Sequence, residues 1–346
     1  MIWIWIAFLV LFLAMLALDL GAFHRHPRAV GLKEALIWSG VWIGAALAFS
    51  VLVYFAYESH WLGLGQAADS VDQVVNDGQS ATEKFLTCFL LEKSLSIDNL
   101  FVIAAVFASL RIPDSLQHRV LFWGILGAVV LRAIMIGLGT ELVQHFHWVL
   151  YIFGGLLLLA ALKMLLPERQ GSDPAHSWPL RTARRILPMT PELHGSQFLA
   201  RISGKWKFTP LALALAVVES SDVIFAVDSV PAALGVTSDP FLVFSSNMFA
   251  MMSLRCLYFA LAGLVMIFKY LKLSVAGILA LIGGKLVAGN WLVDTIGQSL
   301  NLWMLAAVAG ILAIGMIASW IARRRESPAT AAALNPSNQK RAPETA

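Results

Sequence analysis

The sequence predicts an all-α, polytopic membrane protein, and three observations support this fold class. Of the 346 residues, 59% are hydrophobic and 13% are charged, and the mean hydropathy is +0.75. A soluble globular chain is about 45–50% apolar and about 25% charged, so this chain has too little polar surface to cover a fold in water. Its apolar residues also fall in separate runs of roughly 20 residues, the length of a membrane-spanning helix. These features exclude a soluble enzyme.

Nine apolar runs are long enough to cross a bilayer as helices. In chain order they cover residues 2–20, 36–57, 84–108, 120–140, 148–166, 209–234, 241–267, 274–290 and 301–322. We expect one transmembrane domain over residues 1–322. Residues 323–346 begin with three arginines and continue in Ala, Pro, Ser, Asn and Thr. Such a composition buries too little apolar surface to fold, so we expect this tail to be disordered.

The basic residues of the connections predict the orientation of these spans. All 19 Lys and Arg residues outside the spans and their flanks lie in alternate connections and in the tail. The basic connections are 21–35, 109–119, 167–208 and 268–273. The other connections, 58–83, 141–147, 235–240 and 291–300, contain no Lys or Arg. Because basic residues are retained in the cytoplasm, we expect the N-terminus outside the membrane and the C-terminus on its cytoplasmic side. This asymmetry also explains the net charge of +4 without a nucleic-acid partner.

Charged residues within the spans recur at a nearly constant offset. The pairs are Arg132 and Arg255, offset by 123 residues, Asp98 and Asp222, offset by 124, and Lys163 and Lys285, offset by 122. The third to fifth spans and the sixth to eighth spans are therefore predicted to be two copies of one three-helix unit. An odd number of spans in each copy makes the repeats inverted, which is a common plan of secondary transporters. Chance similarity among apolar helices is the alternative.

Two of the spans carry an unusual number of carboxylates. EKSLSIDN contains Glu92, Asp98 and Asn99, and ESSDVIFAVDS contains Glu219, Asp222 and Asp228. Each charge at the centre of a bilayer costs about 2.5–3.5 kcal/mol, so the carboxylates need partners, protons or a bound cation. Carboxylate and amide oxygens suit hard ions such as Mg²⁺, Ca²⁺ and Mn²⁺ rather than copper or zinc. We therefore predict that these six residues are metal ligands.

The helical spacing of these residues limits how they can meet. Asp98 lies six residues after Glu92, and Asp228 lies six after Asp222, so each pair points in different directions around a regular helix. One common site requires either local unwinding of both helices or other helices around them. In a purely structural alternative, the acids only tie the bundle together through Arg132 and Arg255.

The two acidic motifs closely resemble those of the TerC family of bacterial integral membrane proteins, and within it the Alx type. The resemblance rests on Glu92 to Phe101 and Val217 to Ala232, with support from Val130 to Ile136, Leu150 to Gly155 and Ser238 to Asn247. It implies a nine-span protein related to the LysE-type transporters, with a role in manganese export and metal homeostasis. By this resemblance, the acidic motif residues of the family correspond to Glu92, Asp98, Glu219, Asp222 and Asp228.

The function expected from these features is secondary transport that exports Mn²⁺ across the inner membrane. We expect no resident prosthetic group and no enzymatic activity, and the sequence contains no G-x-x-x-x-G-K-[ST] phosphate loop for an ATP-driven pump. The expected partners are the transported ion and the lipid bilayer, while contacts with a translocon or a second copy stay open. The main alternative is a metalation or stress-response scaffold that supplies Mn²⁺ to exported proteins. An intramembrane aspartyl protease is disfavoured because no G-x-G-D motif is present.

Overall fold

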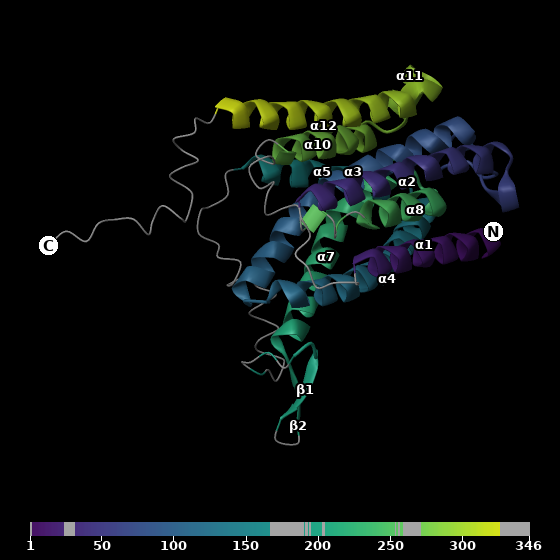
Figure 1. Ribbon diagram of the computed structural model, residues 1–346. Coiled ribbons are helices and arrows are strands. Elements are labelled where there is room, and N and C mark those ends of the chain that lie inside the picture. The colour runs from purple at the N-terminus through teal and green to yellow at the C-terminus, as the bar shows by residue number, and fades with distance from the viewer. Residues whose placement is uncertain are drawn as a thin grey trace.

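The computed structural model describes residues 2–23, 32–166, 190, 193, 195–202, 205–252, 254, 257–258 and 271–325. Long helices lie side by side in one bundle, with α1 and α12 toward opposite sides of it (Figure 1). They are α1 (Ile2–Phe23), α2 (Leu32–Glu58), α3 (Gly78–Ser109), α4 (Asp114–His145), α5 (Val149–Leu165), α7 (Pro210–Leu234), α8 (Pro240–Met252), α10 (Leu271–Ala288) and α12 (Leu300–Arg325). Short elements are η1 (Trp61–Gly63), α11 (Asn290–Ile296) and η4 (Gly297–Ser299).

The helical, polytopic architecture predicted from the sequence is confirmed. Among the described residues, six helices are long and apolar enough to cross a membrane, namely α1, α2, α4, α7, α10 and α12. The apolar helices α5 and α8 are shorter as described, and α3 has 32 residues but carries several charges. The second half of the run 241–267, including Arg255, lies mostly outside the described residues. The number of nine spans therefore stays a prediction.

Several helices are longer than their predicted runs, among them α4, which covers Asp114–His145 rather than 120–140. The helix α3 begins at Gly78, before the predicted residue 84, because the side chain of Asp77 accepts a hydrogen bond from the backbone N–H of Ser80 at 2.7 Å and so caps the first turn. At the other end of the chain, α12 extends to Arg325, into the segment predicted as a disordered tail. Residues 326–346 lie outside the described residues.

Among the described residues, a small β-hairpin departs from the predicted all-α fold. Strand β1 (Leu199–Ile202) pairs antiparallel with β2 (Lys205–Phe208), with Leu199 opposite Phe208. The hairpin projects from the bundle at the start of α7 (Figure 1). Four-residue strands carry too short an alternation for a periodicity argument to detect, so the sequence predicted only a connection here.

The interior of the bundle is built from paired helices. α5 packs along α10, α4 packs against α7, and α3 packs against both α8 and α7, while α12 and α2 cover α3. α5 and α10 approach closely at Gly154 and Gly283, since a Cβ on either residue would lie about 3 Å from the carbonyl oxygen of the other. In the predicted repeats α3 corresponds to α7 and α4 to α8. The packing of α3 against α8 and of α7 against α4 is therefore compatible with two repeats related by symmetry. The inverted repeat itself stays a prediction.

Candidate functional site

A buried guanidinium joins four helices at the centre of the bundle. The side chain of Arg132 in α4 has no exposed surface. Its Nη1 donates hydrogen bonds to Glu92 Oε1 of α3 and, at 2.7 Å, to Asn247 Oδ1 of α8. Its Nη2 and Nε donate to the two carboxylate oxygens of Asp222 in α7, at 3.1 and 3.4 Å. We call these four residues the Arg132 cluster.

Neighbouring polar groups hold the acceptors of this cluster in place. Ser96 lies one turn after Glu92 on α3 and donates its hydroxyl to Glu92 Oε1 at 3.2 Å. The amide nitrogen of Asn247 donates to the carbonyl of Val243 at 3.0 Å, which leaves its oxygen free to face Arg132. The ion pair between Arg132 and Asp222 is bidentate, and such a pair holds both side chains in a defined orientation as well as stabilising the contact. The four helices are therefore tied together at this point, as the structural alternative expected for Glu92 and Asp222.

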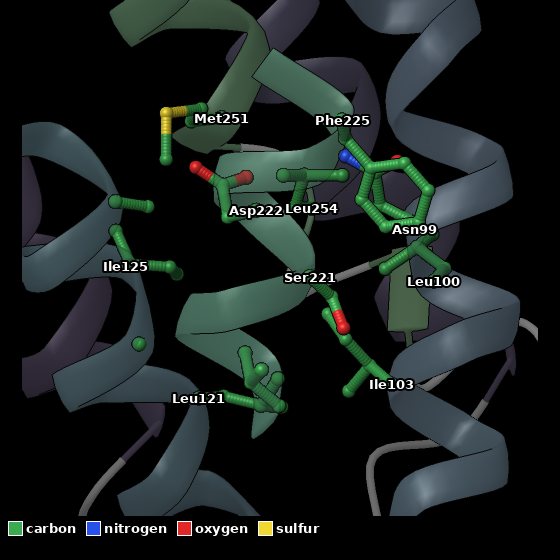
Figure 2. Close-up of a pocket in the computed structure, with 13 residues that line it drawn as sticks. Asn99, Leu100, Ile103, Leu121, Ile125, Ser221, Asp222, Phe225, Met251 and Leu254 are labelled. Atoms are coloured by element: carbon green, nitrogen blue, oxygen red, sulfur yellow. The ribbon is translucent and has the colours of Figure 1, made fainter. Parts of the chain in front are cut away.

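A cavity lies between α3, α4, α7 and α8 (Figure 2), and Asp222 belongs both to its lining and to the Arg132 cluster. Its volume is about 50 Å³, and its polar lining comes from Asn99 of α3 and from Ser221 and Asp222 of α7. The other lining residues are apolar, among them Phe225 and the thioether of Met251. A space of this size accommodates one or two water molecules, so a small ion with little remaining hydration could fit beside the carboxylate of Asp222.

The predicted ligands do not all converge on this cavity. Asp222 and Asn99 line it, and Glu92 is joined to it through Arg132. Glu219 is half-buried against α4, where a Cβ on Gly127 would come within 2.6 Å of Glu219 Oε2. Within the part of the chain that the structure describes, no three His, Cys, Asp or Glu side chains are grouped to hold a metal.

Two further predicted ligands need separate mention. Asp228 is half-buried on α7, and the charge that acts on it is that of Lys163, an exposed lysine in the last turn of α5. The side chain of Asp98 lies outside what the structure describes. Both α3 and α7 are continuous helices through the acidic motifs. Of the two alternatives, local unwinding is not observed, and Glu92 and Asp222 meet through the surrounding helices.

Asn247 is the member of the cluster whose role the sequence reasoning missed. It lies in an apolar run and 25 residues after Asp222, and neither periodicity nor charge marks it. An amide in the middle of a hydrophobic helix is the signal that could have identified it, because a buried polar group needs a partner. Arg255, the predicted counterpart of Arg132, lies outside the described residues.

A second buried polar network lies in the connection between α2 and α3, at one end of the bundle. The carboxylate of Asp69 accepts hydrogen bonds from Lys84 Nζ at 2.9 Å, from Ser238 N at 2.9 Å and from Ser238 Oγ at 2.7 Å, and one from Thr237 Oγ1. Lys84 Nζ also contacts Asp72 Oδ2 at 2.8 Å and Asn76 Oδ1 at 2.6 Å. The connection after α2 is thereby attached to α3 and to the turn after α7.

The charges of this outer network depend on one another. Burial raises the pKa of Asp69, but the Lys84 ammonium and the hydrogen bonds from Thr237 and Ser238 outweigh burial and hold the pKa well below its usual value. Burial raises the pKa of nearby Asp239, although Tyr57 donates its hydroxyl to this carboxylate at 2.7 Å. The network therefore favours an ionised Asp69 paired with Lys84.

Comparison with known proteins agrees with this architecture. Residues 77–327 match the family described as the integral membrane protein TerC family. An "Uncharacterized membrane protein STKORF319" of Myxococcus xanthus is 41% identical over 93% of both chains. A protein of Photorhabdus laumondii named "Putative membrane-bound redox modulator Alx" is 40% identical over 92% of this chain and 95% of its own, and a protein of the same name from Escherichia coli K12 is 40% identical over 93% and 96%. No solved structure matches. The chain belongs to the TerC family of integral membrane proteins.

Proposed function

We propose that this protein is a secondary transporter that exports divalent metal cations, with Mn²⁺ as the favoured ion. The observation that carries the proposal is the position of Asp222, whose carboxylate faces both a buried arginine and a cavity at the junction of four helices. Carboxylates buried in a membrane bundle are costly and generally mark ion pathways. The ion substrate would enter this cavity and bind the carboxylate of Asp222, and Asn99 and Ser221 supply further polar groups along the lining.

The position of the cavity supports access from the cytoplasm. Its lining continues from Asn99 to Ile103 on α3 and reaches Leu121 on α4, toward the ends that flank the basic connection 109–119. The charge asymmetry predicts that this connection is cytoplasmic. At the opposite end, the Asp69 and Lys84 network attaches three segments to one another. In the transport cycle we propose, this arrangement is the state that accepts an ion from inside.

The lining also supports a preference among ions. Ca²⁺ and Mg²⁺ take oxygen ligands, whereas thioether sulfur is a ligand for softer metals. The side chains of Asp222 and Met251 both line the cavity (Figure 2). Three oxygen-bearing side chains favour hard ions, and the single sulfur favours Mn²⁺ over Ca²⁺ and Mg²⁺, because Mn²⁺ is the softest of the three.

The name of the Alx relatives mentions a redox modulator. The described residues of this chain offer no exposed thiol for such chemistry. Cys88 is fully buried in α3, and its thiol contacts the carbonyl of Ala233. Burial away from solvent makes a thiol unreactive, and the described residues contain no other cysteine side chain. We propose that any influence on redox balance follows from the metal content of the cell. The metalation scaffold remains the second candidate, because a scaffold could present Mn²⁺ at the same site.

Transport by the purified protein in proteoliposomes tests the proposal. We expect uptake of Mn²⁺ without any partner protein, weaker uptake of Mg²⁺ and Ca²⁺, and no preference for Zn²⁺. Asp222→Asn should abolish Mn²⁺ uptake, since an amide oxygen is a weaker, neutral ligand of similar shape. Glu141→Gln is the matched control, because Glu141 is an exposed carboxylate at the end of α4. Binding of Mn²⁺ without transport would favour the scaffold, and the absence of both would refute a metal function.

A further inference from the structure

The Arg132 cluster surrounds a cation with the ligands that a divalent metal would use. Two carboxylates and one amide oxygen contact the guanidinium of Arg132, and the same carboxylate of Asp222 lines the cavity proposed for the ion. The carboxylate of Asp222 therefore faces both the guanidinium of Arg132 and the cavity proposed for the transported ion.

We propose that Arg132 is a tethered counter-cation that competes with the transported divalent ion for Glu92 and Asp222. This inference rests on the proposed function and adds how the site releases its ion. When no metal is bound, the guanidinium neutralises the carboxylates. When a metal enters from the cavity, it takes the oxygens of Asp222 and then of Glu92, and Arg132 withdraws from them. The return of Arg132 displaces the ion on the other side.

The charges and hydrogen bonds of the cluster support competition rather than a permanent brace. The cluster as described contains two carboxyl side chains, Glu92 and Asp222, and one guanidinium, so it offers more acidic ligands than Arg132 alone can pair with one to one. Asp222 keeps 15% of its side chain exposed, whereas Glu92 keeps 2%, so an ion would reach Asp222 first. The two bonds from Arg132 to Asp222, at 3.1 and 3.4 Å, are also longer than its 2.7 Å bond to Asn247. Asn247 can thus keep its hydrogen bond to Arg132 while a metal ion replaces the guanidinium at the carboxylate of Asp222.

Competition also answers a general requirement of transport. Two desolvated carboxylates and additional oxygen ligands would bind a divalent ion tightly, and an ion that binds too tightly is not released. A competing state lowers the apparent affinity by the fraction of molecules in which the site is available. Arg132 would thus weaken binding and speed release, and its removal should have opposite effects on binding and on turnover.

The test compares Arg132→Met and Arg132→Lys with the wild type. Mn²⁺ affinity is measured by titration calorimetry on purified protein at pH 8, and Mn²⁺ transport is measured in proteoliposomes. We expect Arg132→Met to bind Mn²⁺ about tenfold more tightly, within the usual range for coupled sites, and to lose transport. Arg132→Lys keeps the charge but cannot engage both acids as a planar fork does, so its affinity and turnover should lie between those of Arg132→Met and the wild type. Arg111→Gln is the control, because Arg111 is exposed on the connection between α3 and α4.

The outcomes separate this inference from the proposed function. If Arg132 only braces the bundle, both variants should bind Mn²⁺ with unchanged or weaker affinity, and the inference is overturned. If Arg132→Met cannot be purified, the affinity of Arg132→Lys decides in the same way. If the wild type transports Mn²⁺ and the variants bind it less well, only the inference fails. If the wild type neither binds nor transports a divalent ion, the proposed function fails first.

Discussion

A methyl group added at Gly127 would move one predicted ligand without removing its charge. Gly127 lies in α4, opposite Glu219 of α7, and a Cβ at this position would lie 2.5 Å from Glu219 Cδ and 2.6 Å from its Oε2. Carbon atoms pack at about 3.5–4.0 Å, so the carboxylate must move by about 1 Å. Because Glu219 is flexible and half-buried, the fold can accommodate this movement. Alanine in place of glycine within a helix even stabilises it, by about 0.5–1 kcal/mol.

Gly137→Ala is a matched control on the same helix, since a Cβ there meets no atom within 4 Å. Both variants should therefore unfold at or above the wild-type temperature in a thermal denaturation assay. If Glu219 belongs to the ion path, Gly127→Ala should transport Mn²⁺ about tenfold more slowly at low concentration, comparable to the loss seen when the support of a metal ligand is disturbed. Equal Mn²⁺ uptake by the two alanine variants would remove Glu219 from the proposed path.

Three further predictions concern selectivity, the outer network and topology. Met251→Leu should keep Mn²⁺ uptake but reduce its preference over Ca²⁺ and Mg²⁺ in competition assays, and an unchanged ion ratio would show that the sulfur takes no part. Lys84→Met leaves two buried carboxylates without their cation, so we expect a loss of about 3–5 kcal/mol of stability, visible as lower membrane abundance. The stability that the lowered pKa of Asp69 contributes is present above about pH 4, the ordinary pKa of Asp, and is lost as the pH falls toward the lowered value, so acid melts of the wild type and of Lys84→Met should converge. A reporter fused after Arg325 should be cytoplasmic and one inserted at Gln66 outside, and the reverse pattern would contradict the proposed direction of access.

The sequence predicted the helices well because bilayer thickness and hydropathy determine them locally. A run of 20 apolar residues has few alternatives in a membrane, since every backbone polar group must be satisfied within the segment. Each of the helices α1, α2, α4, α7, α10 and α12 therefore coincides with one predicted run. The boundaries were less predictable: α3 begins six residues early at the cap on Asp77, and α4 (Asp114–His145) extends several residues beyond the predicted run 120–140 at both ends.

The site was less predictable because it depends on how the helices rotate against one another. The sequence marked Glu92, Asp222 and Arg132 as charges that need partners, and it left open whether they bind metal or each other. Which partners meet depends on the packing of α3, α4, α7 and α8, and Asn247 joins the cluster through that packing alone. Asp69 and Lys84 show the same limit, because only the folded connection after α2 reveals that both are buried.

The continuity of α7 links the two polar networks in the proposed cycle. Asp222 lies near the middle of α7, and the turn that follows this helix contains Thr237 and Ser238, which bind Asp69. Opening the outer end would require these hydrogen bonds to Asp69 to break, and any movement of the turn would be transmitted along α7 to Asp222. A shift of α7 would in turn lengthen the two bonds from Arg132 to Asp222, which are already 3.1 and 3.4 Å. Exchange of the cation at Asp222 and opening of the outer end are therefore expected to occur together rather than independently.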